Sequence, residues 1–519
     1  MPQRYARERP PRATFAPMEW TEQERVRRES LARLRELGID PYPAPAFPVT
    51  HKAEELAAEF QDGLEVRLAG RLMSRRIMGK ASFAELQDGA GTMQLYVNRD
   101  ELCPDEDKTA YNEVFKRLLD RGDFIGVTGV TFTTQTGEPS VSVRTLTVLA
   151  KSLRPLPAVK TDENGVVHDA FSDPELRYRM RYVDLVVNRD VRRTFEARSA
   201  VIRTIRNAFD GSGWLEVDTP VLQAIPGGAS ARPFVTHHNA LDIPLYLRIA
   251  NELYLKRLIV GGFDGVYEFS RNFRNEGMDR THNPEFTVLE LYVAYKDYHW
   301  MMETVEHLLA DVCTAVHGST SCTLQGTSID FTPPFRRVTL RDAILEHAGV
   351  DIDVLDEAGL RAACGELGIH CDASMGRGKL IDTLFGAKAE HHFVQPTFIT
   401  DYPVEMSPLT KAHRDKPGYT ERFELLVNGT EIANAYSELN DPDDQRARFE
   451  DQLRLGERGD DEAMFIDRDF LRALEYGMPP TSGVGIGIDR LVMLLTDAPS
   501  IQDVLLFPQM RPEITHAPA

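Results

Sequence analysis

Two arginine-containing segments carry residue types that could bind a nucleotide. The first, residues 273–286, brings together four polar and aromatic side chains: Arg274, Glu276, His282 and Phe286. A guanidinium group binds phosphates and carboxylates, and an aromatic ring offers a face on which a base can stack. In the second segment, Arg490 follows the glycine-rich run 483–487 and precedes an apolar stretch. Together the two segments predict ATP chemistry without a P-loop.

The composition limits the classes of protein to which the chain could belong. It has 519 residues, of which 42% are hydrophobic and 27% charged, as in soluble globular proteins with more than one domain. No stretch of about twenty apolar residues predicts a membrane span, and the Arg- and Pro-rich start lacks the apolar core of a secretory signal. Five cysteines without a Cys-x-x-Cys pair favour a reducing compartment. We therefore expect a cytoplasmic protein without a membrane partner.

The net charge of −20 argues against a surface that coats nucleic acid generally. A local basic segment could still contact phosphates, because residues 71–80 hold four cations and no acid: Arg71, Arg75, Arg76 and Lys80. An ordinary solvated strand and turn would explain the same residues. On this segment alone the two interpretations stay open.

The organisation of the chain follows from changes in its pattern. A capping box at Thr21 and Glu24 opens a helix in which Val26, Leu31, Leu34 and Leu37 recur at helical spacing, and Gly38 can end it. Prolines then prevent further helix. The predicted divisions are a disordered tail (1–19), a helix and proline-rich linker (20–60), a β domain (61–151), a hinge (152–172), a larger domain (173–512) and a short tail (513–519).

The β domain shows the period of two that strands require. Five strand-like runs lie between residues 65 and 149, with a helix expected over 109–119 after the third. This order predicts an OB-fold barrel, whose outer face binds single-stranded nucleic acid by stacking. Three side chains are the candidates for contact with bases: Phe83, Gln94 and Glu138.

The larger domain is predicted to hold a mixed, mainly antiparallel sheet flanked by helices, so the chain as a whole is α+β. A helix is expected over 191–209, followed by a strand that Pro220 ends. Further strands are predicted at 246–249, 266–269, 286–295, 422–427 and 431–437.

Three segments in order resemble the motifs of class II aminoacyl-tRNA synthetases: the helix and strand ending at Pro220, the Phe-Arg-Asn-Glu loop, and the Gly-Ile-Gly-Ile-Asp-Arg run. The resemblance is closer to the bacterial class II lysyl-tRNA synthetases and covers roughly residues 20 to 510. It is most specific at 227–234, 252–257, 282–292 and 437–441.

The resemblance implies a reaction and the residues that carry it. Arg274 would bridge the amino-acid carboxylate and the α-phosphate, while Arg490 would hold the far phosphate, with the preceding glycines letting backbone approach the nucleotide. The family's remaining ATP-binding positions are Glu276, His282, Phe286 and Glu424. Its magnesium positions are Glu424 and Glu431, since Mg²⁺ prefers carboxylates bridged to phosphate.

The resemblance also implies a lysine pocket made of Gly228, Glu252, Glu290, Tyr292, Asn434, Tyr436 and Glu438. Within it, Glu438 and Tyr292 are expected to bind the ε-ammonium, and Glu252 with the backbone near Gly228 the α-ammonium. Glu290 would be shared. The expected partners are L-lysine, ATP and tRNA(Lys), together with a second copy of the chain that docks through residues 201–220.

Four positions depart from the family pattern. Asn251 stands where a proline is usual, Ala433 and Ala435 replace glycines, and Tyr436 replaces a phenylalanine. None of these removes a charge, so we expect changes in loop stiffness and pocket volume. Two other functions remain open: an aspartate- or asparagine-type synthetase, which needs a cationic pocket, and a catalytically silent RNA-binding paralogue, which would lose Arg274, Glu431 or Arg490.

Overall fold

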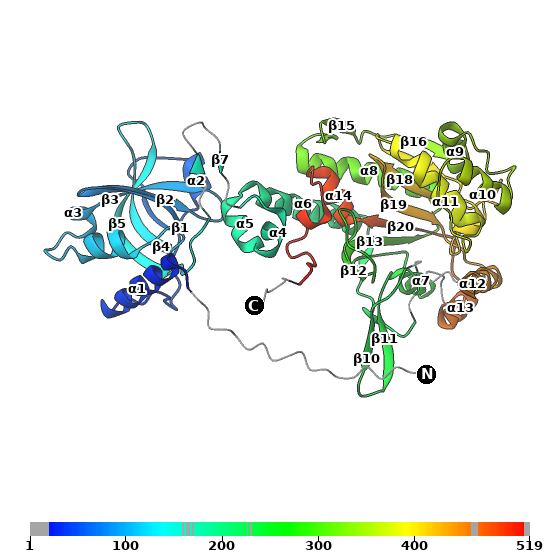
Figure 1. Ribbon diagram of the computed structural model, residues 1–519, viewed down its shortest axis with the longest axis horizontal. Coiled ribbons are helices and arrows are strands. Elements are labelled where there is room, and N and C mark those ends of the chain that lie inside the picture. The colour runs from blue at the N-terminus through cyan, green and yellow to red at the C-terminus, as the bar shows by residue number, and fades with distance from the viewer. Residues whose placement is uncertain are drawn as a thin grey trace. The chain divides into compact units, whose positions relative to one another are not determined.

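The computed structural model describes residues 20–157, 160–161, 167–168, 171–225, 227–228, 231–457 and 466–512. The chain separates into two compact units, one ending at Phe171 and the other beginning at Ser172, and each is described by itself (Figure 1). The predicted tails 1–19 and 513–519 and part of the predicted hinge lie outside the described residues.

The first unit opens with helix α1 (Glu22–Glu36), and its N-terminus is the predicted capping box. Thr21 N–H donates to the Glu24 carboxylate at 2.9 Å, and Glu24 N–H donates to the Thr21 hydroxyl at 3.3 Å. Leu34 is buried as expected, but Val26 is 50% exposed. Arg27 is buried instead, because its guanidinium donates to the carbonyl oxygens of residues 121 and 152.

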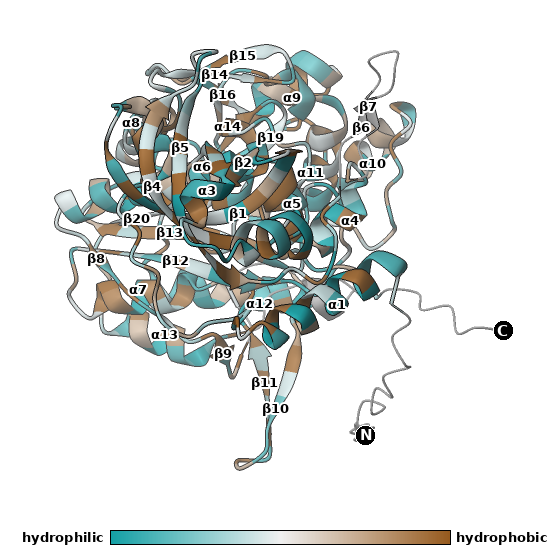
Figure 2. Ribbon diagram, turned by 90° about the vertical axis from the view of Figure 1, so that its left-hand side faces the viewer, coloured by the Kyte–Doolittle hydropathy of each residue, from teal (hydrophilic) through white to brown (hydrophobic). Residues whose placement is uncertain are grey.

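The predicted OB fold is confirmed as a closed five-stranded barrel in the order β1-β2-β3-β5-β4. Its strands are β1 (Glu65–Met78), β2 (Ala81–Gln87), β3 (Thr92–Asn98), β4 (Phe124–Thr133) and β5 (Pro139–Ala150). Apolar residues alternate with polar ones along β4 and β5, as the brown and paler bands of Figure 2 show. The expected helix is the π-helix η1 (Ala110–Leu118). Shorter elements are α2 (Ala53–Ala58), α3 (Arg99–Leu102), β6 (Lys160–Thr161) and β7 (Val167–His168).

The second unit is built on an eight-stranded sheet in the order β16-β17-β18-β19-β20-β13-β12-β8. Its strands are β16 (Arg336–Thr339), β17 (Thr397–Thr400), β18 (Arg422–Val427), β19 (Thr430–Ser437), β20 (Thr481–Gly487), β13 (Glu285–Ala294), β12 (Gly265–Phe273) and β8 (Leu215–Glu216). Only the two edge pairings are parallel, so the sheet is mainly antiparallel as predicted. The predicted strand at 246–249 lies instead in a separate sheet.

The sheet has one apolar face and one polar face because side chains alternate along each strand. Leu289 and Leu291 of β13 lie in the core with Val484 and Ile486 of β20. Three helices complete this core: α6 (Asp190–Gly211), α8 (Tyr298–His317) and α14 (Ile488–Leu495). The residues of opposite parity are left to form a site on the other face.

Smaller elements surround the sheet. A helical subcluster with its own core consists of α9 (Leu340–Ala348), α10 (Glu357–Glu366) and α11 (Arg377–Lys388). Another contains α7 (Glu252–Val260), α12 (Pro442–Glu457) and α13 (Arg468–Glu475). The hairpin of β10 (Val235–His238) and β11 (Ile243–Leu247) joins β9 (Leu222–Gln223) and projects from the body of this unit (Figures 1 and 2). The remaining elements are α4 (Pro174–Arg179), α5 (Arg181–Val187), β14 (Ser321–Leu324), β15 (Thr327–Asp330), and the short turns η2 (Glu390–His392), η3 (Val404–Met406) and η4 (Ile501–Asp503).

Within the described part of the chain, none of the helices combines the length and the apolar character needed to span a bilayer.

A buried ion pair connects α5 to the C-terminal segment of the second unit. Arg181 and Asp184 are fully buried and lie 2.6 Å apart, and Arg181 also donates to the carbonyl oxygens of Gln502 and Leu505. Removing one partner of such a pair leaves an uncompensated buried charge.

Arg181→Met should therefore lower the free energy of unfolding by about 3–5 kcal/mol. The control is Arg193→Met, because Arg193 forms an exposed pair with Asp190 and should contribute no more than about 1 kcal/mol. Urea unfolding of both variants measures the difference. Equal losses in the two variants would contradict a structural role for the buried pair.

Candidate active site

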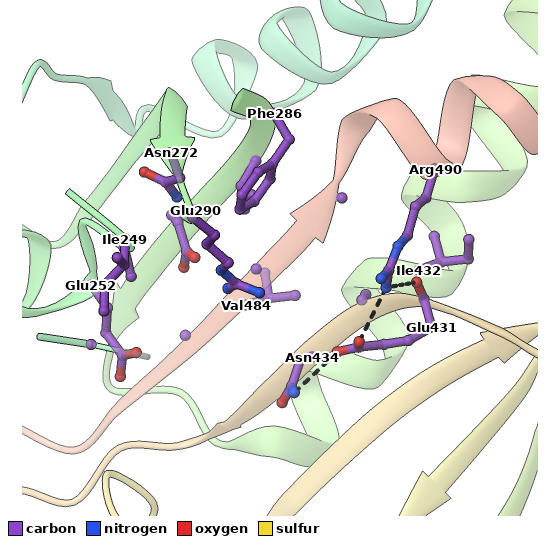
Figure 3. Close-up of a pocket in the computed structure, with 18 of the residues that line it drawn as sticks. Ile249, Glu252, Asn272, Phe286, Glu290, Glu431, Ile432, Asn434, Val484 and Arg490 are labelled. Carbon is purple, nitrogen blue, oxygen red and sulfur yellow. Dashed lines mark hydrogen bonds and ion pairs between the residues drawn. The ribbon is translucent and has the colours of Figure 1, made fainter. Parts of the chain in front are cut away.

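A cavity of about 420 Å³ opens on the polar face of the large sheet. It contains most of the residues that the sequence singled out: Gly228, Glu252, Arg274, Glu276, His282, Phe286, Glu290, Tyr292, Glu431, Asn434, Tyr436 and Arg490. Of the candidates for this site, only Glu424 and Glu438 are not on the cavity wall among the residues that the structure describes. Figure 3 shows that Glu252 and Glu290 lie on one side of the cavity, and Arg490 and Glu431 on the other.

The register of the antiparallel strands explains why distant segments meet here. Each row of paired residues runs across the sheet, so side chains of equal parity from four strands share one line. One row contains Glu290, Gly485, Asn434 and Glu424. The next contains Tyr292, Gly483, Tyr436 and Arg422.

Arg274 has the environment of an anion-binding residue. It follows the end of β12, its backbone N–H donates to the carbonyl oxygen of Pro284 at 2.9 Å, and its guanidinium carbon lies 5.0 Å from the centre of the Phe286 ring. Its buried Nε has no hydrogen-bond partner among the described residues. Burial lowers the pKa of Arg274, but a guanidinium stays charged at any ordinary pH. A buried cation with a free donor favours a carboxylate or a phosphate as its partner.

Arg490 lies in the first turn of α14 and contacts the other side of the cavity. One of its terminal nitrogens donates to the backbone carbonyl of Glu431 at 3.0 Å and to the Glu431 carboxylate at 3.2 Å. The other lies 3.5 Å from Nε2 of His282, whose Nδ1 is 2.9 Å from Asp279. Arg490, His282 and Glu431 thus form one polar cluster, part of which is visible in Figure 3.

Glu424 and Glu431 converge on one amide. The Asn434 side chain donates to each of them at 3.2 Å, and Arg422 donates to Glu424 at 2.6 Å. Burial and the nearby charge of Glu431 raise the pKa of Glu424 to about 7. Two carboxylates that repel each other beside a cavity fit a divalent cation. The described residues contain no group of three or more metal-binding side chains, so further ligands would be phosphate oxygens and water.

Three glutamates lie together at the opposite end of the cavity. Glu252 accepts a hydrogen bond from the Tyr436 hydroxyl, and Glu290 accepts one from Tyr292 at 3.1 Å. Burial and the nearby Glu252 raise the pKa of Glu290 to about 8. Glu438 is 2% exposed beneath the wall, and burial raises its pKa well above the usual value. Such a cluster favours a ligand with positive charge.

Two of the glycines before Arg490 leave space for these acids. A Cβ on Gly483 would lie 2.2 Å from the Glu438 carboxylate and 2.4 Å from the Tyr292 ring, and a Cβ on Gly485 would lie 3.0 Å from the Glu290 carboxylate. The sequence predicts that these glycines let backbone approach the nucleotide. Gly483 and Gly485 also admit the side chains that line and underlie the pocket.

The sequence analysis did not identify three residues of the site. Lys256 lies 2.5 Å from both Glu252 and Glu438, Arg422 pairs with Glu424, and the buried Asn272 lines the cavity. Spacing was an available signal for two of them. Lys256 is four residues after Glu252 on one helix, and Arg422 is two residues before Glu424 on one strand.

Two departures from the family pattern have a structural explanation. The Asn251 side chain donates to Glu268 at 2.8 Å, where Arg248 also pairs with Glu268 at 2.7 Å, so the asparagine helps to satisfy a buried carboxylate. The Tyr436 hydroxyl donates to Glu252. We expected Tyr436 to change only pocket volume and loop stiffness, whereas it also adds a hydrogen bond.

The barrel of the first unit carries the predicted base-contacting residues on its outer surface. The ring of Phe83 lies 5.4 Å from that of Tyr96, which in turn lies 5.7 Å from Phe132, so three aromatic rings from three strands adjoin. Gln94 donates to Ser140 at 2.8 Å, and Glu138 is exposed at the β4–β5 turn. This arrangement offers a stacking surface with hydrogen-bonding groups beside it.

The four cations of residues 71–80 do not share one environment. Arg71 donates to the carbonyl oxygen of Gly122 at 2.7 Å, and Arg75 donates to that of Phe115. Burial lowers the pKa of both arginines. Arg76 and Lys80 are exposed. The two exposed cations are therefore better placed to contact a phosphate than Arg71 and Arg75.

Substituting Gly483 tests the packing of the pocket. Gly483→Ala should lower the free energy of unfolding by about 1–3 kcal/mol, because the added Cβ would overlap Glu438 and Tyr292. Gly487→Ala is the matched control on the same strand, since its Cβ would come no closer than 3.7 Å to the Arg490 side chain. Thermal unfolding of both variants measures the effect. A Gly483→Ala variant as stable as Gly487→Ala would contradict the close contact.

Comparison with known proteins gives the same division of the chain. Residues 173–511 match the family model described as tRNA synthetases class II (D, K and N), and residues 66–149 match the OB-fold nucleic acid binding domain. The chain is 63% identical over 501 residues to the lysine–tRNA ligase of Porphyromonas gingivalis. The aligned residues make up 96% of this chain and 86% of the relative. It is 62% identical over 493 residues to that of Christiangramia forsetii, covering 95% and 87%.

A third relative, the lysine–tRNA ligase of Azobacteroides pseudotrichonymphae, is 61% identical over 496 residues, with 95% of this chain and 99% of the relative covered. Identity at this level extends through both units of the chain. The site geometry and the comparisons together show that the chain belongs to the lysine–tRNA ligase family of the class II tRNA synthetases.

Proposed function

We propose that the chain ligates L-lysine to tRNA(Lys) in two steps: activation of lysine by ATP with release of pyrophosphate, and transfer of the lysyl group to the 3′ end of the tRNA. One observation carries the proposal. A single cavity holds buried or half-buried acids at one end and two arginines at the centre and the other end. The acids suit the two ammonium groups of lysine, and the arginines suit its carboxylate and the phosphates.

In the first step, an oxygen of the lysine carboxylate attacks the α-phosphorus of ATP while the bond to the pyrophosphate oxygen breaks. Two anions must approach each other, so the main requirement is charge compensation and alignment rather than a protein nucleophile. Arg274 would donate to both anions, and the proposal is supported by its Nε, which has no partner among the described residues. Phe286, under that guanidinium, offers its ring to adenine, with Glu276 and His282 on the wall beside it.

Glu424 and Glu431 are the residues that would hold Mg²⁺. A bound magnesium ion would offset the charge of the triphosphate. Without it, Arg490 pairs with Glu431 and Arg422 pairs with Glu424, so both carboxylates already have a cation beside them. When magnesium and ATP bind, Arg490 would leave Glu431 and contact the far phosphate of the nucleotide.

In the lysine pocket, Glu252 and Glu290 on the wall would face the ammonium groups, and Glu438 beneath the wall would add its negative charge. Tyr292 and Tyr436 orient two of these carboxylates through their hydroxyls. Gly228 and Asn434 complete the wall. An amino acid without the second ammonium would leave buried acids unpaired, which disfavours it strongly.

The barrel would bind the anticodon, with bases stacked on the Phe83–Tyr96–Phe132 surface and read by Gln94 and Glu138. Arg76 and Lys80 would contact the RNA backbone.

A homodimer through the region of α6 and β8 is supported by exposed apolar side chains nearby, among them Leu215 (47%), Leu222 (48%) and Val235 (56%). A cytoplasmic location is supported by the cysteines, all five of which are free thiols.

The alternatives have less support from the site. An aspartate- or asparagine-type enzyme needs a cation for its substrate's side chain, whereas the three acids at this end of the cavity outnumber Lys256, the cation that the structure describes beside Glu252 and Glu438. A silent paralogue would have lost part of the ATP site, but Arg274, Glu431 and Arg490 are present and line the cavity.

Exchange of pyrophosphate into ATP, measured with each of the twenty amino acids, tests the function. Lysine alone should support exchange, and purified tRNA(Lys) should then be charged.

Arg274→Met should reduce lysine-dependent exchange by about 10²–10³-fold, because it removes the cation at the reacting centre. The control is Arg271→Met: Arg271 lies three residues earlier, on β12, its side chain is exposed, and its removal should leave exchange unchanged. Exchange with aspartate, or with no amino acid, would overturn the proposal.

The raised pKa of Glu290 predicts how lysine binding depends on pH. With a pKa of about 8, this carboxyl is mostly protonated in the empty pocket at pH 7, and a bound ammonium favours its ionised form. Binding therefore releases a proton below pH 8, and the KM for lysine should fall by up to about tenfold per unit as pH rises from 6 to 8. Glu290→Gln should flatten this slope, and the KM for ATP is the internal reference. A lysine KM that stays constant over this range would contradict the assignment.

A further inference from the structure

Lys256 is a buried cation beneath the wall of the pocket, and the proposed mechanism does not use it. Its side chain is fully buried, and its ammonium lies 2.5 Å from the Glu252 carboxylate and 2.5 Å from that of Glu438. It reaches them from α7, while Glu438 follows β19, so it connects two elements that form the pocket. A fully buried lysine is rare and needs partners of opposite charge.

The surroundings hold the ammonium in place. The rings of Tyr436 on β19 and Phe470 on α13 lie 5.4 and 5.9 Å from it. The two carboxylates outweigh the effect of burial, so the pKa of Lys256 is raised and the side chain stays charged. No described residue other than Lys256 compensates the charge of Glu438, whose oxygens receive no other hydrogen bond. The titratable groups around Lys256 are Glu252, Glu438, Glu290, Tyr292, Tyr436 and the Arg257–Asp467 pair beside Phe470.

The charges around the ammonium end of the cavity can be counted. When they are ionised, the carboxylates of Glu252, Glu290 and Glu438 contribute three negative charges. Lys256 contributes one positive charge, so two negative charges remain uncompensated in the empty pocket. Lysine brings two ammonium groups. The filled pocket is then neutral, whereas without Lys256 it would keep an uncompensated buried charge or bind a proton instead.

We propose that Lys256 is the built-in counter-ion of the amino-acid pocket, which sets the charge of the pocket to match a substrate with two ammonium groups. This inference rests on the proposed function. Lys256 is a positioning residue, since Glu438 and Lys256 lie beneath the wall and Lys256 acts through the carboxylates. Its ammonium offsets the charge of the Glu252 and Glu438 carboxylates and fixes their orientation before the substrate arrives.

The test compares a neutral and a charged substitution. Lys256→Met keeps the length of the side chain but removes its charge, so the acids should bind protons more tightly and the KM for lysine at pH 7 should rise at least tenfold. The loss should shrink as pH rises to 8.5, because the acids then ionise without help. Lys256→Arg keeps the charge and should have a lysine KM closer to that of the unaltered chain, although its side chain is larger. Lysine-dependent pyrophosphate exchange gives both KM values, and the KM for ATP should change less than twofold.

A purely structural role predicts a different result. It would make Lys256→Arg at least as damaging as Lys256→Met, and the loss would be the same at every pH; either outcome would overturn the inference, as would an unchanged lysine KM. Lys296→Met, at an exposed lysine of the same unit, is the control and should be neutral. If Lys256→Met does not fold, Lys256→Gln serves in its place. If the unaltered chain shows no exchange with lysine, the proposed function fails, whereas normal exchange with an unaffected Lys256→Met variant removes only this inference.

Discussion

The pairing of buried charges across the polar face of the large sheet is the constraint on which the rest of the site depends. Acids and bases on or just after β12, β13, β18 and β19, and on α7 and α14, lie close together in a largely buried region, where an unpaired charge is costly. Lys256 with Glu252 and Glu438, Arg422 with Glu424, and Arg490 with Glu431 each satisfy this requirement in the free site. Among the buried or half-buried charged groups that the structure describes on the cavity wall, Arg274 and Glu290 lack an opposite charge at contact distance, and the proposed substrates would supply one to each.

The two ends of the cavity solve the same problem in opposite ways. At one end of the cavity, Arg422 and Arg490 pair with Glu424 and Glu431 in the free protein. Under the proposed function, these pairs would be exchanged for contacts with phosphates and a metal ion. At the other end, burial raises the pKa of Glu290 to about 8, and under the proposed function its proton would leave when an ammonium binds. In both cases the ligand replaces an interaction that the free protein already makes, so the fold does not have to tolerate an open cluster of like charges.

Sequence patterns predicted much of this architecture because they are local. The alternation of apolar and polar residues predicted the barrel strands, and the run of strand-forming residues at 422–427 predicted β18. The capping box predicted the start of α1. The family resemblance indicated residues of which most line one cavity. Patterns failed where tertiary contacts decide. Val26 is exposed while Arg27 is buried, and the strand expected at 246–249 joins a separate sheet, because neither partner is visible in the local sequence. Gly483 and Gly485 make room for acidic side chains, which the local pattern did not predict because it depends on what packs above the two glycines.

The sequence by itself determined the types of element, their order, the family to which the chain is similar and the identity of the charged residues, since these follow from residue type and spacing. The tertiary structure alone decided how those charges are paired. Strand register places Glu290 beside Gly485 and Asn434 beside Glu424, and the docking of α7 places the Lys256 ammonium between Glu252 and Glu438. The reason is physical: the energy of a buried charge depends on the few ångströms to its nearest opposite charge, and a linear sequence does not contain that distance.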